Sequence, residues 1–146
     1  MVGRGPLGPE SSAPNTIGSS CADGASGYFQ VDESSDVIAV RAIDPAAGLR
    51  ELGAVRIEAK VWATASFATD RLDVYVAPNA LAPAWELVGT LTPTRAGPQV
   101  LGVDAALRTG ALQAVRIQLR HAGAENGGCS AGELDDRDDL VFAVAK

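Results

Sequence analysis

The feature that most constrains this chain is a strict alternation of apolar and polar side chains. Between residues 55 and 63 every second residue is valine, isoleucine or alanine, and Arg56, Glu58 and Lys60 stand between them. A period of two puts one kind of side chain on each face of a β-strand. Comparable alternation or short apolar runs recur at 37–43, 72–76, 85–91, 99–103, 115–119 and 140–144. No helical period lasts for three turns, so the pattern predicts an all-β chain of about seven strands.

Turn-forming residues separate these runs. Asp44-Pro45, Thr92-Pro93, Thr109-Gly110 and Asn126-Gly127 all lie between two apolar segments. Short strands at this spacing predict a two-sheet antiparallel β-sandwich of the jelly-roll-like kind. The charged side chains between the apolar ones indicate that each sheet has one face toward water.

The two ends of the chain differ in composition. Residues 1–20 are rich in glycine, proline and serine, and we expect a flexible segment there, followed by a sandwich domain over 21–146.

Cys21 and Cys129 are the only cysteines, 108 positions apart, and His121 is the only histidine, so the spacing argues against a zinc site. The cysteines are either two free buried thiols or a disulfide. We favour the disulfide, and with it a secreted, extracellular protein.

Carboxylates gather in two stretches beside the cysteines. Five fall between Glu133 and Asp139, and a second group runs from Asp23 to Asp36. Such crowding is costly without a cation, and clustered oxygen ligands suit Ca²⁺. The predicted Ca²⁺ ligands are Asp23, Asp32, Glu33, Asp36, Asp135, Asp136, Asp138 and Asp139. The alternatives are an acidic, solvated loop and a pair of catalytic carboxylates.

Other patterns bear on function mainly by exclusion. Residues 128–132 match the G-x-S-x-G motif around Ser130, but no helix pattern follows and the only histidine precedes the serine, so we expect no enzyme activity. The net charge of -6 argues against nucleic acid and anionic membranes as partners. No apolar run approaches the roughly 20 residues of a membrane span.

Aromatic residues suggest one ligand surface and one core position. Trp62 and Tyr75 are expected on the outer faces of adjacent strands, where they could bind a polysaccharide or a protein surface. The alternative is that loops cover both rings. Trp85 is in phase with Leu87 and Leu91 and is expected in the core.

From Cys21 to Val144 the chain resembles a β-sandwich module found at the C-terminus of secreted bacterial proteases and other exported hydrolases. The segments that carry the resemblance are 32–36, 71–75, 85–91, 110–116 and, most specifically, 129–142. The resemblance implies a calcium-stabilised, non-catalytic accessory module that binds a substrate or surface or stabilises its parent enzyme. A second hypothesis is an extracellular structural subunit that self-associates, with residues 1–20 pairing with a neighbour's sheet edge.

Overall fold

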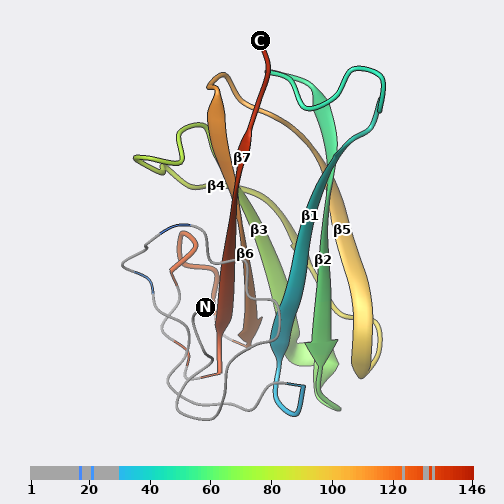
Figure 1. Ribbon diagram of the computed structural model, residues 1–146. Helices are drawn as coiled ribbons and strands as arrows, with labels where there is room; N and C mark the ends of the chain where they lie inside the picture. Colours follow the sequence, from blue (N-terminus) through green and yellow to red (C-terminus); the bar gives the residue numbers. More distant parts are fainter. Residues whose placement is uncertain (1–16, 18–20, 22–29, 123, 130–131, 133) are drawn as a thin grey trace.

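The computed structural model describes residues 17, 21, 30–122, 124–129, 132 and 134–146 (Figure 1). Within these residues the regular secondary structure is strand, apart from one short 3₁₀ turn at Phe67–Thr69. The strands are β1 (Ser34–Ala42), β2 (Ala54–Ala63), β3 (Asp70–Ala77), β4 (Glu86–Leu91), β5 (Gly97–Ala106), β6 (Leu112–His121) and β7 (Asp136–Ala143). The all-β prediction is therefore confirmed.

Two antiparallel sheets form a sandwich. The three-stranded sheet has the order β1-β2-β5, and the four-stranded sheet has the order β4-β3-β6-β7. Across the sandwich β1 lies next to β7 and β6, as Figure 1 shows for β1 and β7. Every strand pair in the two sheets is antiparallel, which confirms the predicted sandwich.

The alternation seen in the sequence fills the space between the sheets. Val55, Ile57, Ala59 and Val61 of β2 are buried, and the residues that alternate with them are half-buried or exposed. On the four-stranded sheet the inner row comes from alternate residues of β3 and β6, which pair Leu72 with Leu119 and Val74 with Ile117. Removing this apolar surface from water is the main stabilising contribution to the fold.

The disulfide predicted from the cysteine count is present. Cys21 and Cys129 are bonded, with their Cα atoms 5.5 Å apart. This bond fastens the segment after β6 to the chain that precedes β1. Ile17 packs nearby against Ala77, Ala80 and Ala114.

The proposed division into residues 1–20 and 21–146 falls mostly on residues outside the described part of the chain. Of the N-terminal segment, the description covers Ile17 alone. Among the described residues no helix has the length and apolar character needed to cross a membrane.

Candidate metal centre

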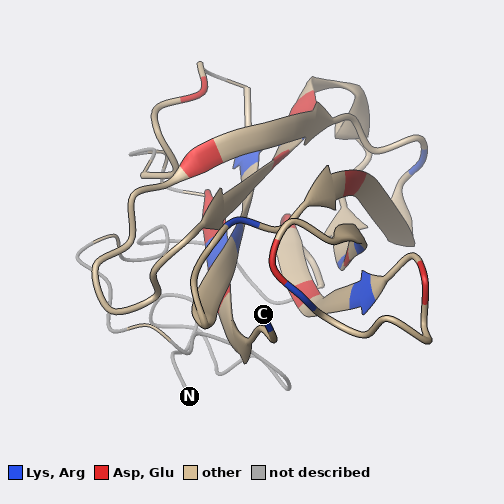
Figure 2. Ribbon diagram, turned by 90° about the horizontal axis from the view of Figure 1, so that it is seen from above, with Lys and Arg blue, Asp and Glu red and all other residues tan. Residues whose placement is uncertain are grey.

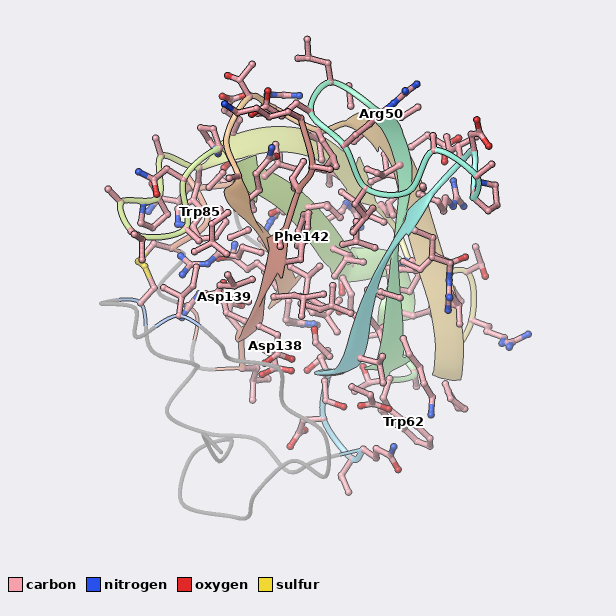
Figure 3. The ribbon with its side chains drawn as sticks, turned by 45° about the horizontal axis from the view of Figure 1, so that its top comes forward. Arg50, Trp62, Trp85, Asp138, Asp139 and Phe142 are labelled. Atoms are coloured by element: carbon pink, nitrogen blue, oxygen red, sulfur yellow. A yellow bond between two sulfur atoms is a disulfide. The ribbon has the colours of Figure 1, made fainter. Side chains whose placement is uncertain are left out.

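The alternation of β7 divides its four consecutive charged residues between two faces. Asp136 and Asp138 pair with Leu119 and Ile117 of β6, whose side chains belong to the core. Opposite residues in an antiparallel pair share a face, so these two aspartates point into the sandwich. Asp139 lies on the other face, opposite Arg116. Figure 3 shows Asp138 and Asp139 on opposite sides of the strand.

Asp139 was predicted as a calcium ligand, and the structure gives it a different role. Its two oxygens accept hydrogen bonds from Arg116 Nε at 2.7 Å and Nη2 at 2.9 Å, and both side chains are buried. Arg116 Nη1 also donates to the Gly128 carbonyl, and its guanidinium carbon lies 4.4 Å from the centre of the Trp85 ring. The carboxylate is already neutralised by a bidentate partner on the outer face of the sheet.

The same stacking corrects the prediction for Trp85. The residue precedes β4 and lies over Arg116 on the outer face of the four-stranded sheet, not between the sheets. The alternation of Trp85 with Leu87 and Leu91 predicted one common face. The pairing of β3 with β4 shifts register between Val74 and Tyr75, and Leu87 is exposed, so this alternation does not continue into the core.

The three-stranded sheet adds residues to the same end of the interior. Ser35 pairs with the buried Val61, and its N–H donates to Asp136 Oδ2 at 2.5 Å. This hydrogen bond joins β1 to β7 across the sandwich. Glu33, two residues earlier, is also buried, and its Oε1 accepts a hydrogen bond from Thr64 Oγ1 at 3.2 Å.

Asp36 was another predicted ligand, and a β-bulge turns it away from this interior. The register of β1 against β2 shifts between Ser35 and Val37. Asp36 accepts hydrogen bonds from Ser34 Oγ and Gln30 Nε2, both at 3.1 Å, and lies 3.9 Å from Lys60 Nζ. Lys60 is an outward residue of β2, so Asp36 belongs to the outer face.

Two residues that the sequence reasoning did not select complete the centre. Asp70 begins β3, His121 ends β6, and the two are directly paired. His121 Nδ1 lies 2.8 Å from Asp70 Oδ1 and 3.2 Å from Glu33 Oε1. One potential ligand atom from each of these three residues lies within 4.8 Å of the others. Their association depends on strand register, which no local pattern in the sequence reports.

The remaining predicted ligands lie beside the centre or outside the description. Asp135 accepts hydrogen bonds from the backbone N–H of Gly132 at 3.1 Å and of His121 at 3.3 Å, which shapes the turn before β7. Asp32 is half-buried. Asp23 and Ser130 lie outside the described residues.

The resulting interior is strongly acidic. Glu33, Asp70, Asp136 and Asp138 are each at most 1% exposed and come from both sheets. Figure 2, which views the molecule from above, shows acidic positions on several strands. Glu33 Oε2 and Asp70 Oδ2 are buried and have no hydrogen-bond partner within the described part of the chain. Buried carboxylates of this kind require a proton or a cation.

The protonation of Asp70 and His121 reflects this environment. Burial raises the pKa of Asp70 above its usual 3.8, although the hydrogen bond with His121 acts in the opposite direction. The same hydrogen bond, with Asp70, raises the pKa of His121 above 6.5. Without a metal, therefore, the folded protein holds protons at this end more tightly than the unfolded chain does.

A pH dependence follows for the metal-free protein. A group whose pKa is higher in the folded protein than in the unfolded chain adds to the free energy of unfolding. This contribution is fully present at pH values below the pKa of the unfolded chain, and it is lost as the pH rises through the pKa of the folded protein. In EDTA the free energy of unfolding should therefore be lower at about pH 8 than at about pH 5. Urea denaturation at the two pH values measures the difference. His121→Gln should lose the part that falls above about pH 6.5, whereas an unchanged pH dependence in this variant would contradict the assignment.

The predicted aromatic ligand face does not form. Tyr75 is on β3 of the four-stranded sheet and is 1% exposed, and Trp62 is on β2 of the other sheet. Tyr75 Oη donates to Glu125 Oε1 at 2.6 Å, so the segment after β6 covers the tyrosine ring. We expected β2 and β3, which follow one another in the chain, to be neighbours in one sheet. The chain instead passes from one sheet to the other between β2 and β3. Trp62 alone is partly accessible.

Comparisons of this chain with protein-family models, with curated proteins and with solved structures find no match. The resemblance to the accessory modules of exported hydrolases therefore stays a prediction from the segments that suggested it.

Proposed function

We propose that this chain is a non-catalytic extracellular module whose sandwich is closed at one end by Ca²⁺, and that it serves as an accessory unit of a secreted hydrolase. The observation that carries the proposal is that the carboxylates of Glu33, which precedes β1, and Asp70, which begins β3, approach within 4.8 Å. Each has a buried carboxylate oxygen without a hydrogen-bond partner in the described chain, and both lie beside His121. A cation at this point would bridge the sheets.

The composition of the ligand set favours calcium. Ca²⁺ takes 6–8 oxygen ligands, and the buried carboxylates of Glu33 and Asp70 supply hard oxygen ligands of this kind. Zinc sites instead rely on several nitrogen or sulfur ligands, and here His121 is the one histidine of the chain. The residues expected to hold the ion are Glu33 and Asp70, with His121 beside them. The buried Asp136 and Asp138 of β7 lie on the same inner face.

Burial also supports a structural role over a catalytic one. Catalytic carboxylates must reach a substrate, usually in a concave pocket. Glu33 and Asp70 are almost completely inaccessible. The disulfide supports an oxidising, extracellular setting, where calcium sites with dissociation constants of about 10⁻⁴–10⁻³ M are filled. The accessory role itself rests on the resemblance over 21–144.

Calcium should stabilise the protein against unfolding. An ion that binds the folded state alone adds about 2.7 kcal/mol at a hundredfold excess over its dissociation constant. Melting in EDTA and then in calcium measures this, and calorimetry gives the affinity. Asp70→Asn should abolish most of the calcium response. The melting of this variant in EDTA is the reference for its own calcium response, because the substitution removes a buried charge and also the ionic hydrogen bond to His121.

Asp104→Asn is the matched control for this experiment. Asp104 is exposed on β5 and pairs with Arg56, so the calcium response of this variant should equal that of the wild type. If melting does not respond to calcium, and calorimetry detects no binding at millimolar calcium, the buried carboxylates are held by protons alone and the proposal fails.

A further inference from the structure

Two arginines on the outer face of the four-stranded sheet hold carboxylates in the same way. Each uses its side-on edge, which is formed by the Nε and Nη2 N–H groups. Arg116 binds Asp139 through this edge at 2.7 and 2.9 Å. Arg120 binds Asp73 through the same edge, at 2.6 Å from Nε and 3.4 Å from Nη2. A planar carboxylate accepts both donors of such an edge, which gives the pair strength and a defined geometry.

Arg71 is a third arginine on this face, and its side-on edge has no carboxylate among the described residues. It lies directly opposite Arg120 in the pairing of β3 with β6, and it is the one residue of β3 that is not buried. Its Nη1 donates to the backbone carbonyls of Ala68 at 2.8 Å and Asp70 at 2.7 Å. These bonds orient the guanidinium group, while Nε and Nη2 make no hydrogen bond or ion pair within the described part of the chain. The edge of Arg71 is therefore available to a ligand.

Arg71 lines an open depression of about 370 Å³ on this face. The 3₁₀ turn before β3 and the end of β6 form its walls, and the lining residues are Ala68, Thr69, Arg71, Arg120 and Ala122. The two walls are tied together, because Ala122 N–H donates to the Thr69 carbonyl at 3.1 Å. Ligand pockets range from about 300 to 1,000 Å³, so this depression suits a small molecule or one unit of a polymer.

The charges around the depression favour a singly charged anion. Asp73 offsets the charge of Arg120, which leaves Arg71 as the source of one positive charge on this part of the outer face. On the inner side of the same two strands, Asp70 is paired with His121 at 2.8 Å. The chain as a whole carries a net charge of -6, which opposes the approach of a dianion such as phosphate. A carboxylate matches the edge of Arg71 in both charge and shape.

The rest of the lining suits a polar ligand body. Besides the arginines it consists of the methyl groups of Ala68 and Ala122 and the hydroxyl of Thr69, without a large apolar or aromatic side chain. Thr69 Oγ1 donates to the Ser66 carbonyl at 2.8 Å, so its oxygen can accept a hydrogen bond from a ligand hydroxyl.

We propose that this depression binds the carboxylate of a small hydroxylated acid, such as a uronic acid. The carboxylate lies on Nε and Nη2 of Arg71, and a hydroxyl of the ligand donates to Thr69 Oγ1. The site is distinct from the metal centre, because the pleat of β3 sends Arg71 outward and Asp70 inward.

NMR titration of the intact chain with sodium glucuronate, at constant ionic strength, tests the inference. A ligand of this size with one bidentate ion pair should bind with a dissociation constant of about 1–10 mM. The shifts should centre on 68–71 and 120–122 and include the Nε–H of Arg71. Methyl glucoside, which has the sugar ring without the carboxylate, should cause no saturable shift. Inorganic phosphate should bind more weakly than glucuronate, and so should an acetylated dialanine, whose carboxylate is attached to an apolar body.

Three variants assign the binding to the edge of Arg71. Arg71→Gln should raise the dissociation constant about tenfold or more. Arg71→Lys keeps the charge without the planar edge and should raise it about threefold or more. Arg41→Gln is the matched control, because Arg41 is an exposed arginine of β1 that contacts Glu58, and it should bind as the wild type does.

Each titration is made in EDTA and again with saturating calcium, so a failure of calcium binding is recognised separately from a failure of this site. The absence of a saturable shift up to about 50 mM glucuronate under both conditions would overturn the inference. An Arg71→Gln variant with wild-type affinity would overturn it as well. Tighter binding of phosphate or of the dipeptide would show that the ligand is not a hydroxylated monocarboxylate.

Discussion

Replacing Arg116 with methionine should lower the free energy of unfolding by about 3–5 kcal/mol, because it leaves the carboxylate of Asp139 buried without its partner. The pair is bidentate and both side chains are at most 2% exposed, so solvent screens it little. The arginine also stacks on Trp85 and bonds the Gly128 carbonyl, and these contacts are lost with it. Urea denaturation, with folding checked by circular dichroism, measures the change.

The double variant Arg116→Met with Asp139→Leu separates charge burial from packing. Removing both charged groups leaves no orphaned carboxylate, and buried ion pairs are often replaced by apolar residues at little net cost. The double variant should therefore regain most of the stability that the single variant loses. Lys60→Met is a control, since its contact with Asp36 is long and the lysine is exposed. A single variant as stable as the wild type would show that the pair contributes nothing.

Removing the disulfide should have an effect of similar size. The bond closes a loop with a sequence separation of 108 residues, and the loop-entropy model assigns up to about 4–5 kcal/mol to such a constraint in the unfolded chain. Thermal melting of the Cys21→Ser, Cys129→Ser double variant should show a corresponding fall in Tm. Reductant should lower the Tm of the wild type and leave the double variant unchanged.

The calcium affinity of the double cysteine variant distinguishes between two roles of the disulfide. If the bond acts through the unfolded chain alone, the double variant should bind calcium with wild-type affinity. Asp70 is held by its pairing with His121, and Glu33 directly precedes β1 and is bonded to Thr64. Weaker calcium binding would mean that the bond also positions the turn at Asp135. A double variant as stable as the wild type would contradict the loop-entropy argument.

The sequence predicted the fold better than it predicted the site residues. Asp138 and Asp139 are adjacent and chemically identical, and the sequence treats them alike. The pleat of β7 sends one into the acidic interior and the other to Arg116. Counted back from the inward Ile38 in a regular strand, Asp36 would also point inward, but the bulge between Ser35 and Val37 reverses it. Of the predicted ligands, Glu33, Asp136 and Asp138 are buried in the interior, and their binding of calcium stays a prediction.

The sequence by itself determined the all-β class and most strand positions, because side-chain alternation is a local property. It also favoured the disulfide, since two cysteines allow only one pairing, but the structure decided that the bond is present. Tertiary structure alone decided that Asp70 meets His121 and Glu33. It also decided that Tyr75 is covered and that β5 is the edge strand of its sheet. These relations join residues distant in sequence. They depend on strand register and on which sheet each strand enters, and both are set by the packing of the whole core rather than by any short segment.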